Sequence, residues 1–450
     1  MTTRSMTRRE LLATAGAGAV GMSAFGRLAL GHLGNLALSG EQANKETDVD
    51  TPSLTDVIFY LSNGRVGAIR PDGSDECYPE FAAPNQVYWG LGYVFPDGRQ
   101  AVLYSEEPPQ NPKAAFGDPD GKAFARTHQW RYDFVTRAMR EIALPSYAGI
   151  MGLLPGEDRF LVLENTSNVA RLYSTDLDGR KQEEYYTSPG YAYGNSLSPD
   201  GRQVAFHITG GPNFPVYAIC VVTLVNKACT VIANDPAWLY FGPIWSPDGQ
   251  WVLYQRCAHR EDPGHDRSDL CLSRADGSQH RLLTHGQAHW FAAAMGTPEL
   301  KGSGSNGPAW SPDGRHIACT LLLPDSRTAW PYRVGQPDLD HFNRDYRPEL
   351  ARGGTRVCMI EPMTGKTTAI THDDPPTWYV RPAWSPDSKR LAVGRADVGT
   401  QPELWVMDAD GTHSHLLTRG IDGLGADNCR WLQLTAEAAA TLWQVSEGGD

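Results

Sequence analysis

Cysteine and histidine are concentrated in one short stretch of the chain, where they could bind a soft divalent metal ion. Cys257 and His259 are followed by His265 and Cys271. Two thiolates and two imidazoles can enclose a metal tetrahedrally, with zinc favoured. A metal ion would also order the charged loop 260–269. The spacing matches no standard zinc finger, and cysteines in an oxidising compartment can pair with each other instead.

A second set of residues combines groups that can transfer protons with groups that can bind an anion. His207 ends a short apolar run, and Tyr240 and Arg256 flank the next hairpin-like segment. Each also has a structural interpretation. A histidine there can simply be solvated, a tyrosine can fill a channel, and an arginine can pair with a carboxylate such as Glu106.

An internal repeat defines the elements that must position these residues. The phrase Trp-Ser-Pro-Asp-Gly, or a variant of it, occurs at 245–249, 310–314, 384–388, 197–201, 95–98 and 154–158. Proline presets the second position of a type I turn, aspartate suits the next, and glycine takes the left-handed position that closes a tight hairpin. The aromatic residue before the turn is expected to pack between neighbouring sheets.

Each repeat continues with a β run, an Asp-Gly or Thr-Gly turn and another strand, so that a unit supplies four antiparallel strands. Six units show the first hairpin. The opening unit, 57–80, lacks its first strand, and the segment 428–445 carries Cys429-Arg430-Trp431-Leu432 where that strand would sit. This pattern predicts an all-β fold, a seven-bladed β-propeller over residues 54–445, with the ring closed by strands from both chain ends. Residues 446–450 are a tail.

Propeller geometry predicts which residues meet. The Ser-Pro-Asp-Gly turn joins the first two strands of a blade at one face. Residues before the first strand and after the second therefore share the opposite rim of the central channel. Besides His207, Tyr240 and Arg256, this rule selects Tyr88, Trp89, Asn195, Asn306, Tyr379, Arg381 and Arg395 as substrate-binding candidates.

Charge and the N-terminus limit the partners and the compartment. The net charge is −12, which argues against a nucleic-acid-binding protein. Residues 1–31 contain the pair Arg8-Arg9 and then a weakly apolar run of small residues, typical of a twin-arginine export signal rather than of a membrane span. Residues 32–53 form a polar linker. We therefore expect a periplasmic or secreted protein with no integral membrane span in the mature chain.

The repeat phrase resembles that of the TolB-like propellers over nearly the whole mature chain. No Gly-x-Ser-x-Gly nucleophile motif accompanies it. An exported propeller without a second domain also resembles the propeller polysaccharide lyases of the oligogalacturonate lyase and ulvan lyase type. That resemblance implies β-elimination on an acidic oligo- or polysaccharide. It implies that Arg256 neutralises the uronate carboxylate, that His207 and Tyr240 form the base/acid pair, and that Asn195 helps to polarise the carboxylate.

The chain departs from this family at one metal site. Oligogalacturonate lyases hold Mn²⁺ partly through a His-x-His pair, where this sequence has Tyr379-Val380-Arg381. The ulvan lyase type, with tyrosine and arginine flanking one hairpin, fits better. Arg256, Arg381 and Arg395 are expected to give the channel of this acidic protein a local positive charge. The alternative is a non-enzymatic TolB-like propeller that binds a protein or a glycan.

Overall fold

The structure, a computed structural model, describes residues 53–108, 126–156, 158–166, 169–209, 217–258, 267–290, 306–331, 345–373 and 375–444. The predicted export signal, most of the predicted linker and the tail lie outside these residues. Histidines 259 and 265 also lie outside them.

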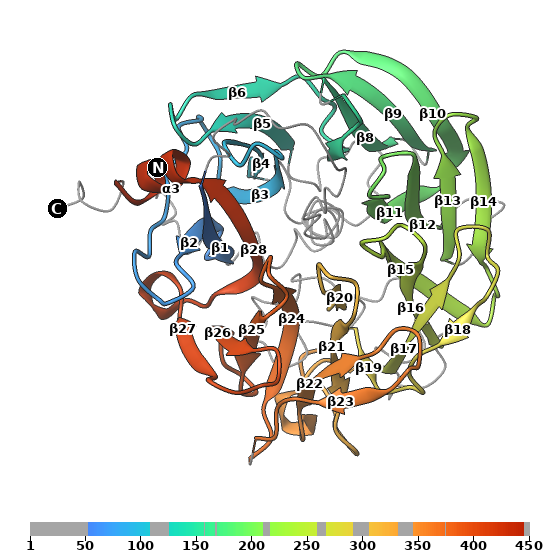
Figure 1. Cartoon of the computed structure of the whole chain (residues 1–450), viewed down its shortest axis with the longest axis vertical. Helices are drawn as coiled ribbons and strands as arrows, with labels where there is room; N and C mark the ends of the chain where they lie inside the picture. Colours follow the sequence, from blue (N-terminus) through green and yellow to red (C-terminus); the bar gives the residue numbers. More distant parts are fainter. Residues whose placement is uncertain are drawn as a thin grey trace, which may run out of the picture.

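Antiparallel strands dominate the fold, and Figure 1 shows their sheets arranged around a common centre. One sheet contains β2 (Arg65–Ile69), β1 (Leu54–Ser62) and β28 (Asp427–Thr435). The next two are β3 (Tyr88–Val94), β4 (Gln100–Glu106), β5 (Thr127–Asp133) and β6 (Met139–Ile142), and β7 (Ala148–Leu153), β8 (Arg159–Thr166), β9 (Val169–Asp176) and β10 (Lys181–Pro189). A further sheet contains β11 (Tyr191–Leu197), β12 (Gln203–Thr209), β13 (Ala218–Thr223) and β14 (Ala228–Ala233).

The remaining strands form one large sheet and one four-stranded sheet. The large sheet contains β15 (Trp238–Trp245), β16 (Val252–Ala258), β17 (Arg267–Ser273), β18 (Arg281–Leu282), β19 (Ala288–His289), β20 (Ala309–Trp310), β21 (Ile317–Leu322), β22 (Thr355–Ile360) and β23 (Thr367–Ala369). Only two residue pairs, between β17 and β19, join its two halves. The last sheet contains β24 (Trp378–Trp384), β25 (Arg390–Ala396), β26 (Glu403–Asp408) and β27 (His415–Thr418).

The repeated turn folds as its chemistry predicts. In the copy after β15, the amide of Gly249 donates to the carbonyl of Ser246 at 2.9 Å, and the Ser246 hydroxyl donates to Asp248 at 2.5 Å. Gly249 has a φ of 67°, the left-handed conformation that glycine adopts without strain. The tryptophan before the turn bridges two sheets, since Trp245 Nε1 donates to the Ser196 carbonyl at 3.1 Å. The predicted tight hairpins and inter-sheet aromatic packing are confirmed at this copy.

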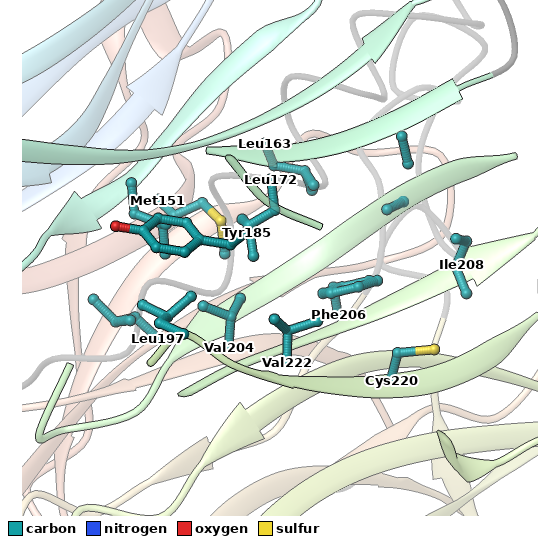
Figure 2. Close-up of a cluster of buried hydrophobic side chains, with 14 of the residues drawn as sticks. Met151, Leu163, Leu172, Tyr185, Leu197, Val204, Phe206, Ile208, Cys220 and Val222 are labelled. Atoms are coloured by element: carbon teal, nitrogen blue, oxygen red, sulfur yellow. The ribbon is translucent and has the colours of Figure 1, made fainter. Parts of the chain in front are cut away.

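Neighbouring sheets are held together by apolar side chains that interleave between them. Figure 2 shows one such layer, in which Leu163 and Leu172 face Val204, Phe206 and other side chains of the next sheet. These side chains are almost completely buried, and area removed from water at about 25 cal/mol per Å² makes such layers the main stabilising contribution. A rigid ring of this kind can hold side chains at its centre in fixed positions.

The two ends of the described chain meet in one sheet. β28 pairs with β1 over an antiparallel register from Leu54 opposite Thr435 to Leu61 opposite Asp427. The sequence analysis placed only a strand in 428–445, but the strand ends at Thr435 and α3 (Ala436–Trp443) follows. Alanine and leucine favour helix there, and Thr435 caps it by accepting from the amide of Ala438 at 3.2 Å. Two 3₁₀ turns, η2 (Pro348–Leu350) and η3 (Ile421–Gly423), complete the described elements.

The strands nearest the centre of Figure 1 share an irregularity that shapes the site. β11, β15, β24 and β28 each contain a register shift against the next strand. Each has a residue with positive φ three positions before Leu197, Trp245, Trp384 or Trp431: Gly194 (52°), Gly242 (60°), Arg381 (51°) and Asn428 (56°). A β-bulge of this kind bends a strand and redirects its side chains.

Candidate functional site

Except for Asn306, which precedes β20, the predicted catalytic and substrate-binding residues lie inside strands rather than beside them. His207, Arg256 and Arg395 belong to β12, β16 and β25, whereas the sequence analysis placed them after these strands. Tyr88, Trp89, Asn195, Tyr240, Tyr379 and Arg381 belong to β3, β11, β15 and β24. The strands extend two or three residues further than the apolar runs suggested, because backbone pairing continues past the bulges.

His207 is held in a fixed orientation between two sheets. Its side chain is almost completely buried, at 4% exposed. The amide of Gly242, on the neighbouring sheet, donates to Nδ1 at 3.2 Å. The rings of Tyr193 and Tyr217 lie 5.4 Å from the imidazole. A ring nitrogen that accepts a hydrogen bond carries no proton, so the neutral imidazole carries its proton on Nε2.

Glycine is required beside this histidine. A Cβ on Gly194 would lie 2.6 Å from both Cε1 and Nδ1 of His207 and 3.4 Å from the Cα of Gly242. Normal carbon contacts are about 3.5–4.0 Å. The bulges of β11 and β15 therefore leave space for the imidazole and bring a backbone amide to it.

Tyr240 lies directly opposite Arg256 in the β15–β16 pair, but its ring packs between sheets. The side chain is 6% exposed, and its ring lies 6.1 Å from that of Tyr254. Burial raises the pKa of Tyr240 to about 12, with a further contribution from the negative charge of Asp235. The hydroxyl therefore stays protonated at neutral pH and is a proton donor.

The three arginines that were predicted to make the channel basic each have a carboxylate partner. Arg256 Nε lies 3.4 Å from Asp269, and its guanidinium stacks on the ring of Trp238 at 4.0 Å. Arg381 pairs with Asp427 of the neighbouring sheet. Arg395 lies 3.3 Å from Asp373. The expected local positive charge is therefore neutralised at these three positions, as the structural interpretation of these arginines anticipated.

The two amides have different environments. The Asn306 side chain donates to the carbonyl of His289 and to the Thr320 hydroxyl, both at 2.6 Å, and accepts from the Arg381 amide at 2.7 Å. It therefore joins strands instead of facing a ligand. Asn195 is 1% exposed, and its Oδ1 has no hydrogen-bond partner among the described residues. A buried amide oxygen without a partner costs about 1–3 kcal/mol, so Asn195 is the better binding candidate.

The remaining aromatic candidates pack against neighbours. Trp89 contacts Phe81 at 5.1 Å and Trp130 at 5.9 Å. The hydroxyl of Tyr379 donates to Asp373 at 2.9 Å. Tyr88 is buried, with its ring 5.9 Å from that of Tyr104. Trp89 and Tyr379 are therefore parts of the core rather than of an open surface.

The proposed zinc ligands are not brought together. In the β16–β17 pair, Tyr254 lies opposite Cys271, whereas Cys257 lies opposite Ser268. Side chains alternate between the two faces of a strand, so Cys257 and Cys271 point to opposite faces. Cys257 packs with Trp290, and Cys271 packs with Tyr254. The expectation that both cysteines share one zinc ion, or one disulfide, is therefore wrong.

The described part of the chain contains no other candidate metal site. No group of three or more His, Cys, Asp or Glu residues in the described ranges could hold a metal ion. All eight cysteines are described, and all are free thiols.

Sequence reasoning missed Arg430. Its guanidinium lies between β28 and β3, where Nη1 donates to the carbonyls of Gly92 and Leu91. It lines a cavity of ≈ 20 Å³ with Phe59, Tyr60, Leu61, Leu91, Tyr104 and Asn428. An available signal was its place directly before Trp431, where other copies of the repeat carry Ile244, Ala309 and Ala383.

Comparisons with known proteins give the fold and no family. No family model and no curated protein matches the chain. TolB from Acinetobacter baumannii is 14% identical, covering 84% of this chain and 82% of its own, with a TM-score of 0.42. Oligogalacturonate lyase from Vibrio parahaemolyticus is 14% identical over 82% of this chain and 86% of its own, with a TM-score of 0.46.

A third solved structure, a puromycin hydrolase mutant, has a TM-score of 0.50. It is 16% identical and covers 81% of this chain but 52% of its own. At such identities the likeness concerns the fold alone. The chain has a TolB-like β-propeller fold, and oligogalacturonate lyase is similar to it in fold. No helix in the described part of the chain is long and apolar enough to cross a membrane.

Proposed function

We propose that the chain is an exported lyase that cleaves a uronic-acid-containing oligo- or polysaccharide by β-elimination at the centre of the propeller. The observation that carries the proposal is the setting of His207, whose imidazole is buried and fixed in one tautomer by the Gly242 amide. A buried, preorganised donor suits a reaction whose main demand is to stabilise an enolate-like intermediate. The oligogalacturonate lyase fold is consistent with this chemistry.

The geometry changes the roles that the resemblance implied. In this tautomer His207 donates through Nε2, so we assign it to the sugar carboxylate, where charge develops when the C5 proton leaves. Tyr240 keeps its proton at neutral pH and is assigned to the leaving oxygen. Asn195 is assigned to the carboxylate through its side-chain NH2 group, which donates, whereas its unpartnered Oδ1 can accept only from a donor such as a sugar hydroxyl. Arg256 is assigned a positioning role, because its guanidinium holds Trp238 and Asp269. None of these residues is a base, so we assign the C5 proton to a solvent water molecule, and Tyr240 regains from solvent the proton that it gives to the leaving oxygen.

We further propose that the ring has seven blades. The nine-stranded sheet counts as two, β15–β18 and β19–β23, because only two residue pairs connect these groups. The β1–β28 pairing then closes the ring. We propose the same domain division as the sequence suggests: an export signal at 1–31, a linker at 32–53 and one propeller at 54–445.

Incubation with pectic, ulvan and glucuronan oligomers tests the function. A lyase forms a conjugated unsaturated uronate, which raises the ultraviolet absorbance. Replacing His207 by Phe removes the Nε2 donor while keeping an aromatic ring, and should lower the rate about 10²–10³-fold, the cost of losing one donor to a developing oxyanion. The control variant is Arg99→Met. The Arg99 side chain is 42% exposed and paired with Asp133, so this replacement should leave the rate unchanged. Unchanged activity in His207→Phe would remove His207 from the mechanism.

One observation favours a non-enzymatic binding propeller instead. Arg256, Arg381 and Arg395 are all paired with carboxylates, which reduces the attraction of the channel for an acidic polymer. If no oligomer is cleaved, glycan-array binding of the full chain distinguishes a glycan-binding propeller from one that binds a protein.

A further inference from the structure

Arg430 occupies a position that the repeat otherwise fills with small or apolar residues. It directly precedes Trp431, just as Ile244, Ala309 and Ala383 precede Trp245, Trp310 and Trp384. At the corresponding place in β15, Ile244 belongs to a buried apolar cluster that also contains Ile317 and Cys319 of β21. A charged residue at a core-type position contradicts the local pattern, and such contradictions occur at functional sites.

The charge of Arg430 is not neutralised by the described protein. Its hydrogen bonds go to the carbonyls of Leu91 and Gly92, and no described carboxylate contacts it. Nε is buried and has no partner among the described residues. This differs from Arg256, Arg381 and Arg395, which each have a carboxylate. Burial lowers the pKa of Arg430 to about 10, so the guanidinium remains charged at neutral pH.

Arg430 as a whole is half-buried, but its Nε is inaccessible to solvent. Removing a charged group from water without a counter-charge is costly, and a ligand that supplies the counter-charge offsets this cost. The cavity beside Arg430 provides the space. It measures ≈ 20 Å³, and its walls include the polar side chains of Asn428, Tyr60 and Tyr104 as well as Arg430. A space of this size admits a water molecule or one oxygen of a carboxylate group.

The backbone beside the cavity is also unusual. Asn428 has a φ of 56°, the left-handed conformation that β11 and β15 reach with Gly194 and Gly242. For a residue other than glycine this conformation costs about 1 kcal/mol or more, and it is retained where surrounding structure or function requires it. In β28 the bulge places the Asn428 side chain at the wall of the cavity.

We propose that Arg430 and its cavity form a binding site for a single carboxylate group, with Asn428 and Tyr104 as neighbouring polar groups. The carboxylate comes either from a uronic acid sugar or from a small organic acid. The site is independent of the proposed lyase chemistry. Binding to it neutralises the guanidinium and fills the space between β28 and β3.

Calorimetric titration of the full chain tests this site. Sodium acetate, sodium galacturonate and sodium chloride are titrated separately into protein in a dilute buffer without added salt, so that no other anion competes for the guanidinium. We expect acetate or galacturonate to bind with one site per chain. Equal affinities indicate a general carboxylate site, and at least tenfold tighter binding of galacturonate indicates a sugar site. Binding of chloride alone, or of neither carboxylate, would overturn the proposal.

Two variants localise the binding. Arg430→Met removes the charge at similar length and should weaken carboxylate binding at least tenfold. Arg99→Met removes an arginine that is paired with Asp133 and should bind as the wild type does. Equal binding by the Arg430 variant would refute the site. If Arg430→Met does not fold, the melting temperature of the wild type is compared with and without the carboxylate. A bound carboxylate must raise this temperature, so an unchanged value would refute binding. Galacturonate has no glycosidic bond to cleave, so failure of lyase activity leaves this result unaffected.

Discussion

The substitution Gly194→Ala tests whether the packing around His207 serves the site. The new Cβ would lie 2.6 Å from Cε1 and Nδ1 of His207, so the ring must move and lose its hydrogen bond from Gly242. The left-handed φ of 52° costs an alanine about 1–2 kcal/mol. The lost hydrogen bond adds about 0.5–1.5 kcal/mol. The expected destabilisation is therefore about 1.5–3.5 kcal/mol.

Gly314→Ala is the matched control. Gly314 has a φ of 70°, and the nearest atom to its new Cβ is Pro247 Cδ at 4.0 Å, so this variant carries the backbone strain without the clash. Urea unfolding gives the free energy of unfolding of both variants when its dependence on urea concentration has the same slope as in the wild type. We expect Gly194→Ala to be the less stable variant by about 1 kcal/mol and to lose activity, whereas Gly314→Ala retains it. Equal stability together with full activity in both variants would refute the argument.

Three further predictions concern other parts of the molecule. The pKa of Tyr240 rises from 10.0 to about 12 on folding, so this group stabilises the fold below pH 10 and its contribution is lost as the pH rises from about 10 to 12. Tyr240→Phe should remove about 2 kcal/mol of that alkaline loss, measured by urea unfolding at several pH values; an unchanged pH profile would contradict the assigned burial effect. Cys229 is the single exposed cysteine of the eight, so a brief alkylation of native protein should label it first, as peptide mass mapping can show; prior labelling of Cys319, whose thiol pKa is raised by complete burial, would contradict the packing. Deleting residues 427–450 removes the partner of β1 and exposes its edge, so light scattering should detect aggregation; a stable monomer would argue against closure by β28.

The sequence predicted those features that depend on local chemistry. The Ser-Pro-Asp-Gly hairpins are specified within five residues, since turn geometry and the Ser246-to-Asp248 hydrogen bond need no distant partner. The same reasoning located the segment containing β28, although it did not foresee α3. The pattern of turns was therefore enough to predict a β-propeller.

The site was harder to predict because it depends on contacts between sheets. The pairing of Arg381 with Asp427 joins residues 46 positions apart, and no spacing rule indicates it. The left-handed conformations of Arg381 and Asn428 could not be seen because neither residue is glycine. Cys257 and Cys271 are close in sequence, but strand alternation separates them.

The mass of the cleavage products tests the central claim most directly. β-Elimination splits a uronate oligomer into two products whose masses add up to that of the substrate, whereas hydrolysis adds one water. Mass spectrometry of the wild-type reaction should show the first result, with slower product formation by His207→Phe. Products that contain an added water, or no cleavage of any uronic-acid polymer, would contradict the account.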